Sequence, residues 1–594
     1  MGSIFCVCHP NAETKAQATH TLLEKSQYRG SSEYLSKDAL TLGCQQNHGE
    51  ASTASTAYLN CTLYGFFTKD SPSPTSSNEA KKLLHYWQKE GPSCIKNTGG
   101  QFSFIVYDQK QKNIYFGNSA DGARPLFYHF NHEALYVATE IRQVISSADI
   151  KTELNTTGAV RTFLHASVPE ATLTAYKNVL RCPPGDILSI ALPLTDSPKR
   201  ILQHWHPEEI LRRPEWKIDE WHDYLAELLP KIMDEYLPTE PSALLLSGGI
   251  DSAGLWAIAK TSRKNTSHLR SISLIYPGWD SDEYHYIDAL HKKLNSNGIF
   301  IDARDASPAE HLESEVASLD QWLWAGSTFQ LDQTLNAARE GGQQSILTGL
   351  GADEWLLSQR GYVSDLFWQG HIFKAAKLGI SYSGDRFPAY SWQQTKRFLR
   401  TTFLPENGFL RKHLRPPRPP IWLSDEWQEA WKDWYQERIN LYIDKPIAQQ
   451  QLIRLSEFRR SGITGESLEQ RVAQFGLHDR HPYTDYRIMR FAFSIPADFV
   501  DRRQWKELQR SCFKSMLPVE ILNRNRCTEH ASIRNMAKFK PPTIKNVNKW
   551  ALVNSGIADQ SRLITHISNL QQQSYLTEIE YLNTAELFLR SRFM

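Results

Sequence analysis

The residues best suited to chemistry form one short stretch, SGGIDS at 247–252. Gly248 and Gly249 allow backbone N–H groups to approach a ligand closely, and a helix after them would point its positive end at that ligand. Ser247 and Ser252 add hydroxyl donors, and Asp251 can hold a metal ion. No lysine is placed to reach a γ-phosphate, so the stretch differs from the GxxxxGK[ST] loop. We interpret it as a phosphate-binding loop; a tight structural turn is the alternative.

A second motif, ILTGLGADEWL, follows about a hundred residues later. Gly349 and Gly351 predict a turn at the end of an apolar strand, and Asp353 follows that turn. Asp251 and Asp353 would then both lie after the carboxyl ends of strands, where ligands of open α/β sheets bind. Together they could bind Mg²⁺ that carries a leaving pyrophosphate. Two solvated loop carboxylates are the alternative.

The surrounding elements predict two domains. Residues 1–205 contain short apolar or alternating runs separated by turn residues, which is typical of antiparallel strands. Residues 206–594 begin with a helical pattern and continue with alternating strands and helices, which predicts a parallel α/β sheet. An aromatic-rich insert at about 360–450 interrupts this pattern. It places Trp427, Trp431 and Trp434 on one helical face, more typical of core packing than of a substrate wall.

Composition excludes several classes of protein. The 594 residues include 41% hydrophobic and 22% charged residues, with a net charge of +2, so nucleic acid is not expected as a partner. No apolar run is long enough to span a membrane, and the N-terminus lacks a secretory pattern. The eight cysteines form no CxxC pair, which favours free thiols in the cytoplasm.

Four blocks together resemble the synthetase domain of the asparagine synthetase family: SGGIDS, GLGADE, GLHDRHPYTDY and QWKELQRSCFKSMLPVEILNRNR. In the N-terminal half GGQFSFIVYD, DGARPLFY and TEIRQVI are also similar to the family, so the resemblance covers about 1–530. It implies an N-terminal Ntn-hydrolase-like antiparallel sandwich. It also implies a C-terminal ATP-pyrophosphatase domain, of the adenine nucleotide α-hydrolase-like type, with added helices. The implied chemistry is adenylation of a carboxylate with ATP and Mg²⁺, followed by attack of a nitrogen nucleophile.

The resemblance also indicates that the glutaminase half is inactive. Family members carry the nucleophilic cysteine directly after the initiator methionine, where its own α-amine acts as base. Here that position is Gly2. Cys6 and Cys8 lie inside the first strand pattern and are expected to be buried packing. Gln46 and Ser77 stand at the places that grip the carboxylate and the amine of glutamine, so we predict no glutamine hydrolysis.

Three further departures concern the acceptor. Leu350 stands where asparagine synthetases carry Glu and β-lactam synthetases carry a basic-acting Tyr, whereas a peptide α-amine, already partly neutral at pH 7, needs less base catalysis. Arg526 takes the place of the family lysine that stabilises charge on the reacting groups. His478 takes the place of a family Glu and is a candidate base, although a structural histidine is the commoner outcome.

The predicted function is ATP-dependent macrolactam formation, as in lasso peptide cyclases. An Asp or Glu side chain of a precursor peptide is adenylated, and the peptide's N-terminal amine attacks it. The alternatives are β-lactam synthetase-like or ammonia-dependent asparagine-type synthesis, and a non-catalytic member that binds ATP or a partner. The resemblance further implies a leader protease and a leader-recognition protein as partners.

Overall fold

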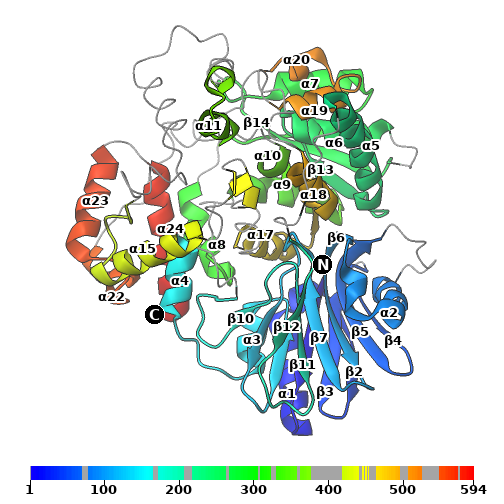
Figure 1. Cartoon of the computed structure of the whole chain (residues 1–594), viewed down its shortest axis with the longest axis vertical. Coiled ribbons are helices and arrows are strands. Elements are labelled where there is room, and N and C mark those ends of the chain that lie inside the picture. The colour runs from blue at the N-terminus through cyan, green and yellow to red at the C-terminus, as the bar shows by residue number, and fades with distance from the viewer. Residues whose placement is uncertain are drawn as a thin grey trace.

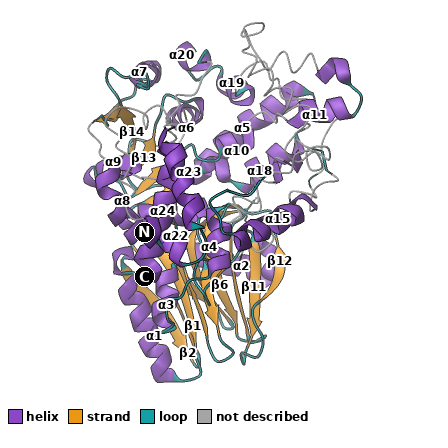
Figure 2. Cartoon of the chain, turned by 90° about the vertical axis from the view of Figure 1, so that its left-hand side faces the viewer, coloured by secondary structure: helices purple, strands orange, loops and turns teal. Residues whose placement is uncertain are grey.

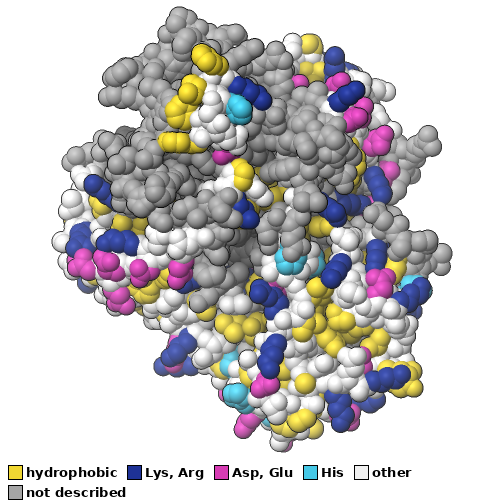
Figure 3. Space-filling view, in the orientation of Figure 1, with side chains coloured by type: hydrophobic (Ala, Val, Ile, Leu, Met, Phe, Trp, Pro, Cys, Tyr) yellow, Lys and Arg dark blue, Asp and Glu magenta, His cyan; other side chains and the backbone are white. Residues whose placement is uncertain are grey.

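A computed structural model describes residues 2–47, 49–69, 78–164, 172–206, 210, 217–261, 266–304, 308–322, 329–356, 361–375, 418–440, 445–446, 449–450, 452–453, 463–495, 506–524, 547–572 and 576–594. The described residues form an antiparallel half and a parallel half, one below the other in Figure 1. No helix among the described residues is long and apolar enough to cross a membrane. Basic and acidic side chains are interspersed over the described part of the face in Figure 3.

Two antiparallel sheets, each with six strands in the described chain, make up the N-terminal half. The first has the order β10 (Leu180–Arg181), β8 (Phe127–Phe130), β9 (Leu135–Ala138), β1 (Gly2–Cys8), β3 (Leu40–Gln46) and β2 (Ser31–Lys37). The second has the order β12 (Lys199–Gln203), β11 (Asp186–Ala191), β7 (Asn113–Asn118), β6 (Gly99–Asp108), β5 (Leu59–Thr68) and β4 (Ala51–Ser55).

Period-2 alternation along β1 builds two of the cores. Ile4, Cys6 and Cys8 face the core between the two sheets, whereas Phe5 and Val7 face a core shared with helices. Those helices include α1 (Ala12–Lys25), α3 (Ile141–Ser147) and α4 (Thr156–Phe163), while α2 (Glu79–Glu90) packs on the second sheet. The result is the predicted sandwich of antiparallel sheets between helices.

The C-terminal half contains a parallel sheet with the order β15 (Gly298–Asp302), β14 (Leu269–Ile275), β13 (Ser242–Leu245), β16 (Ser345–Leu347) and β17 (His478–Arg480). Helices cover both faces, as a parallel sheet requires. One face packs against α5 (Ile218–Tyr236), α6 (Ile250–Thr261), α7 (Tyr284–Lys293), α18 (Tyr486–Ser494), α19 (Glu507–Phe513) and α20 (Val519–Leu522). The other packs against α9 (Phe329–Glu340) and α17 (Ile463–Gln474). Short helices α10 (Ala352–Leu356) and α11 (Gly361–Trp368) follow β16.

A third group of helices joins the two halves. It contains α8 (Pro308–Ser318), α15 (Asp425–Asn440), α22 (Ala551–Asn554), α23 (Gln560–Gln572) and α24 (Leu576–Phe593), which lie beside α4 in Figures 1 and 2. Trp427 and Trp434 of α15 are buried in the same hydrophobic core as residues of α4 and α24. The tryptophan stripe of the insert is therefore mainly core packing. Short 3-10 turns occur at Gln27–Arg29 (η1), Gly91–Ile95 (η2), Pro482–Thr484 (η5) and Val547–Lys549 (η6).

Candidate active site

The two predicted motifs meet in the middle of the parallel sheet. β13 pairs with β14 on one side and with β16 on the other, so the strand order reverses at this point. The SGGIDS loop follows β13 and the TGLGADE turn follows β16, and both lie at the carboxyl edge of the sheet. This is the topological switch point at which open α/β sheets bind ligands.

Hydrogen bonds hold the first loop in shape at the N-terminus of α6. The backbone N–H of Ser247 donates to Ser252 Oγ at 3.1 Å, and the two serine hydroxyls are 3.0 Å apart. The N–H of Gly249 donates to Ser247 Oγ at 3.3 Å. A helix N-terminus with serine hydroxyls and glycine N–H groups beside it is suited to bind phosphate oxygens.

Asp251 and Asp353 converge on one cation, the ammonium of Lys506. Lys506 Nζ forms an ion pair with Asp251 and lies 2.7 Å from Asp353 Oδ1. Lys506 precedes α19 and has left-handed backbone angles, with φ of 58°, which are unusual for a residue with a side chain. Gln509, one turn further on, donates to Asp251 Oδ1 at 3.3 Å. The two aspartates predicted to lie close together are therefore within reach of one small cation.

Burial raises the pKa of Asp251 to about 6, with Asp353 acting in the same direction and Lys506 opposing both. Burial alone would lower the pKa of Lys506, but the two carboxylates outweigh it and raise that pKa. Lys506 is therefore a fixed positive charge at neutral pH. An electrostatic site of this kind needs little reorganisation when charge develops on a substrate.

An anion already occupies one N–H group of the loop. The backbone N–H of Gly248 donates to Glu283 Oε2 at 2.9 Å, and Arg524 Nη2 donates to Glu283 Oε1 at 2.6 Å. The guanidinium of Arg524 also stacks on the ring of Tyr286, 4.5 Å from its centroid. A carboxylate held by a backbone N–H and a guanidinium occupies the kind of place that a phosphate group would take.

The donor set fits Mg²⁺. No cluster of three or more potential ligands from His, Cys, Asp and Glu occurs in the described part of the chain, so Asp251 and Asp353 would bind the metal as a pair. Mg²⁺ is commonly held by one or two carboxylates together with substrate phosphates and water. Two carboxylates beside the SGGIDS loop meet that requirement, with Lys506 as a neighbouring positive charge.

The other predicted site residues are placed differently. Gly351 has a φ of +101°, so the turn before Asp353 depends on glycine there. His478 does not join the phosphate loop, because its imidazole is buried against the N-terminal half, with Nδ1 4.0 Å from Glu50 Oε2. Arg526 lies outside the described residues, and so does Ser77.

Gly2 lies in β1 with no room for a side chain. A Cβ atom on Gly2 would come within 2.7 Å of the Tyr64 ring and 3.0 Å of Ala51 Cβ. Tyr64 is held there by its hydroxyl, which donates to Glu469 Oε1 at 2.8 Å, and by Arg124, whose guanidinium lies over the ring at 4.8 Å. The space that a nucleophilic side chain on residue 2 needs is filled.

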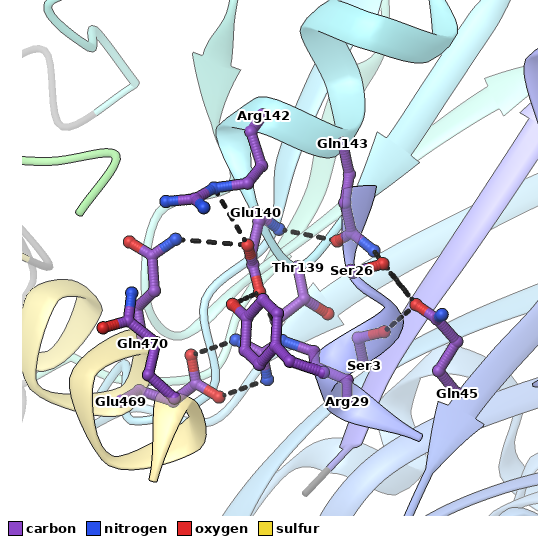
Figure 4. Close-up of polar contacts among 12 residues, drawn as sticks. Ser3, Ser26, Arg29, Gln45, Thr139, Glu140, Arg142, Gln143, Glu469 and Gln470 are labelled. Carbon is purple, nitrogen blue, oxygen red and sulfur yellow. Dashed lines mark hydrogen bonds and ion pairs between the residues drawn. The ribbon is translucent and has the colours of Figure 1, made fainter. Parts of the chain in front are cut away.

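A buried ion network surrounds the same strand (Figure 4). Arg29 forms two parallel hydrogen bonds with Glu469, Nη1–Oε1 at 2.7 Å and Nη2–Oε2 at 2.9 Å, and also pairs with Glu140 and donates to the Gly2 carbonyl. Glu469 belongs to α17, so this network joins the two halves. Cys6 and Cys8 are buried behind it, and burial raises the pKa of the Cys8 thiol to about 11. The two cysteines are packing residues, as predicted.

An antiparallel Ntn-like sandwich joined to a parallel sheet, with a glycine loop at the switch point, is the architecture of an asparagine-synthetase-type, ATP-dependent amide ligase. The sequence model of the asparagine synthase family matches residues 225–590, and that of a glutamine amidotransferase domain matches residues 63–197. The chain belongs to the asparagine synthase family.

Curated relatives agree with this family. The chain is 21% identical to asparagine synthetase [glutamine-hydrolyzing] 3 of Bacillus subtilis (strain 168), over 80% of this chain and 73% of that protein. It is 20% identical to putative asparagine synthetase [glutamine-hydrolyzing] 2 of Methanocaldococcus jannaschii, over 39% of this chain and 44% of that protein. It is 25% identical to amidase chry2 of Gibberella zeae, over 30% of this chain and 26% of that protein. A solved allosteric regulatory enzyme of purine biosynthesis aligns over 52% of this chain and 81% of its own, at 13% identity and a TM-score of 0.25, too low to support an inference.

Sequence reasoning missed three residues of this site. Glu283 is a single charged residue about 35 positions away from the loop it contacts, and no local pattern marks it. Lys506 lies within the QWKELQRSCFKSMLPVEILNRNR block but was not predicted to contact the loop, which is about 255 positions away. Tyr483, whose hydroxyl donates to the Asp251 carbonyl at 3.2 Å, lies within the recognised GLHDRHPYTDY block but was not singled out. Each contact depends on the fold bringing separate segments together.

Proposed function

We propose that the protein closes a macrolactam in a precursor peptide, as lasso peptide cyclases do. A side-chain carboxylate of Asp or Glu is adenylated by ATP, pyrophosphate leaves, and the peptide's N-terminal amine attacks the acyl-adenylate and releases AMP. A leader protease and a leader-recognition protein would supply the trimmed peptide, and the proposal places the reaction in the cytoplasm.

The observation that carries the proposal is the filled space at Gly2. Without room for a nucleophilic side chain there, the N-terminal half has no means of releasing ammonia from glutamine. The phosphate-binding loop and both aspartates are nevertheless present. A family member that keeps the adenylating residues and has lost the ammonia supply needs another nitrogen nucleophile, and a peptide amine meets that need.

The acceptor side of the site supports an amine. Leu350 follows Gly349 in the turn after β16, and its side chain can neither accept nor donate a proton. A peptide α-amine has a pKa of about 7.7–8.0, so part of it is already nucleophilic at pH 7. An amide nitrogen, as in β-lactam closure, would need a much stronger base than an aliphatic side chain.

The described residues have separable roles in the proposed adenylation. The N–H groups of the loop and the N-terminus of α6 bind phosphate oxygens, and Ser247 and Ser252 orient them. Asp251 and Asp353 hold Mg²⁺, which supplies charge neutralisation for the leaving pyrophosphate when it is bound. Lys506 provides a second fixed positive charge beside them, and Arg526 would act on the α-phosphate.

The test supplies ATP and Mg²⁺ together with aspartate, glutamate, or linear peptides that have a free N-terminus and a single internal Asp or Glu. We expect pyrophosphate release with peptides, loss of one water from the peptide by mass spectrometry, and no glutamate from added glutamine. Asp251→Asn should abolish turnover, whereas Asp196→Asn, at an exposed carboxylate, should not. Asparagine formed from aspartate would contradict the proposal, and no release with any acid would indicate a non-catalytic protein.

A further inference from the structure

Amide formation requires a proton acceptor for the attacking nitrogen, and neither Leu350 nor the candidate base His478 is placed to provide one. Leu350 has no titratable group, and His478 is buried against the N-terminal half. A different histidine lies at the carboxyl end of β17, directly beside the turn that follows β16. This residue, His481, is buried and hydrogen bonded on both ring nitrogens.

Four groups form a continuous series of hydrogen bonds. Thr348 Oγ1 lies 2.7 Å from His481 Nδ1, and His481 Nε2 lies 2.8 Å from Asp479 Oδ2. The backbone N–H of Leu350 donates to Thr348 Oγ1 at 3.2 Å. The Thr348 hydroxyl is therefore bonded to the backbone of Leu350, whose own side chain cannot act as a base.

The chemistry of the groups fixes the direction of the series. The carboxylate of Asp479 can only accept, so His481 Nε2 carries the proton. Nδ1 of the neutral ring is then an acceptor, and the Thr348 hydroxyl donates to it. Hydroxyl, imidazole and carboxylate stand in the same order as in a catalytic triad, in which the carboxylate stabilises the imidazolium that forms.

Asp479 is held ionised by the N-terminal half. Arg124 Nη1 donates to Asp479 Oδ1 at 2.7 Å, and Arg124 Nη2 donates to the Asp479 carbonyl at 2.7 Å. Burial alone would raise the pKa of Asp479, but Arg124 and His481 outweigh it and hold this pKa well below its ordinary value. Gln101 of β6 accepts from the backbone N–H of His481 at 3.0 Å. Among the hydrogen-bonded neighbours of the imidazole in the described residues, Asp479 is the charged one, and Arg124 is bonded to it from behind.

The series begins next to the phosphate-binding loop. Thr348 is partly exposed, whereas His481 and Asp479 are buried. Gly349, the next residue, approaches the loop so closely that a Cβ atom on it would lie 3.2 Å from the Ser252 backbone nitrogen. Tyr483, two residues after His481, donates to the Asp251 carbonyl. The turn after β16 and the η5 turn after β17 therefore both border the place at which the acyl-adenylate would form.

We propose that Thr348, His481 and Asp479 form the proton relay that deprotonates the attacking nitrogen, with Thr348 facing the nucleophile and His481 and Asp479 acting through it as positioning residues. The inference rests on the proposed amide-forming function. It gives the N-terminal half a role in the reaction, because Arg124 fixes the last member of the relay.

The proton balance is complete without a further reactant. The C–N bond forms as the bond between the acyl carbon and the AMP oxygen breaks, and AMP leaves with the electron pair. The nitrogen passes its surplus proton to Thr348 Oγ, which passes its own proton to His481 Nδ1. The imidazolium faces Asp479 and returns to the neutral ring by releasing the proton through Thr348 to solvent after AMP leaves.

The test separates adenylation from amide formation in the full-length protein. Its three readouts are ATP–pyrophosphate exchange with the linear peptides named above, hydroxamate formation from added hydroxylamine, and macrolactam closure. Hydroxylamine is mostly neutral at pH 7, and because it is small and free in solution it can pass its surplus proton to water instead of to the relay. Thr348→Val and His481→Gln should change exchange and hydroxamate formation less than about fivefold and slow closure about 100-fold, the usual contribution of a proton-transfer group.

Two controls keep the result specific. Thr348→Ser retains the hydroxyl and should restore closure to within about fivefold of wild type, in line with a proton-transferring role. His129→Asn changes another buried, hydrogen-bonded histidine, in the N-terminal half, and should leave the ratio of closure to exchange unchanged. Equal losses in all three readouts, or unchanged closure, would overturn the relay. No exchange by the wild type with any peptide would overturn the proposed function itself, and the relay with it.

Discussion

Lys506 is the residue on which the charge balance of the site depends. Its ammonium lies against both aspartates that are proposed to bind Mg²⁺, and its side chain is almost fully buried. A buried ammonium between two carboxylates stays charged only because both remain close to it. The position of Lys506 therefore indicates that a positive charge is favoured between Asp251 and Asp353.

At this scale we predict that Lys506→Met lowers the rate of pyrophosphate release at least about 100-fold, because one fixed electrostatic group is lost. Lys506→Arg keeps the charge with a different shape and should retain part of the rate. Pyrophosphate release at saturating ATP and Mg²⁺ measures both. A full rate for Lys506→Met, with its circular dichroism unchanged, would show that the ammonium is only structural.

Which site residues could be predicted depends on how local their pattern is. Ser247, Gly248 and Asp251 lie within five residues of one another, so their types and order were sufficient to predict a ligand-binding loop, and that loop lies at the switch point of the sheet. Asp353 required only the rule that parallel strands end at one edge of the sheet. Lys506 lies in a block that resembles the family, but it reaches the loop from 255 positions away, and the block alone does not indicate which residue it contacts.

At the scale of elements, β17 and the η5 turn after it make the contact between the sheet and the N-terminal half. His478, Asp479 and Arg480 lie in β17 itself, and each faces a charged side chain of the N-terminal half, namely Glu50 or Arg124. Thr484 and Asp485 continue the contact with Gln101 and the Gly100 N–H. Three consecutive strand residues in polar contacts with the N-terminal half cannot be recognised as such from hydropathy, because the segment reads as a polar loop.

Burial is the main cause that lowers the pKa of His478 well below its ordinary value, while Glu50 acts against it. Below about pH 6.5, His478 therefore binds a proton in the unfolded chain but not in the folded protein. The free energy of unfolding decreases as pH falls through this range. At pH 5 this loss is at most about 2 kcal/mol, the limit set by the ordinary histidine pKa of about 6.5. His478→Asn should remove this part of the loss.

Urea unfolding of wild type and His478→Asn between pH 7 and pH 5 measures this difference. His132→Asn, at an exposed histidine, is the matched control and should follow the wild type. Parallel curves for wild type and His478→Asn over that range would show that His478 is protonated in the folded protein, contrary to its burial.

At the scale of the whole molecule, the N-terminal half is tied to the synthetase half by buried ion pairs. Arg29 joins Glu140 to Glu469, Arg181 joins Glu466 of the same helix at 3.0 Å, and Arg124 joins Asp479. The two-part architecture and both sheet types were predictable from strand patterns, but the ion pairs between the parts were not, because partners 285 to 440 residues apart leave no local signal.

We predict that Arg29→Met destabilises the protein by about 3–5 kcal/mol, since it leaves two buried carboxylates without their cation. This loss of stability should weaken the contact between the two halves, so that each half unfolds in a separate step. Urea unfolding followed by tryptophan fluorescence and by circular dichroism would resolve them. Lys199→Met, which removes an exposed ion pair with Asp196, should change little. A single unchanged transition for Arg29→Met would contradict this account.

The ring of Tyr64 beside Gly2 limits how position 2 can evolve. A substitution that removes a side chain can ordinarily be reversed by one further substitution, as long as its space stays open. Here the ring of Tyr64 occupies that space, and its hydroxyl is bonded to Glu469, which Arg29 also holds. A cysteine returning at position 2 would displace Tyr64 and disturb the junction between the halves. If ammonia release was lost in this lineage, as we propose, the way back is closed to any single mutation, and selection can act only on the remaining ligase.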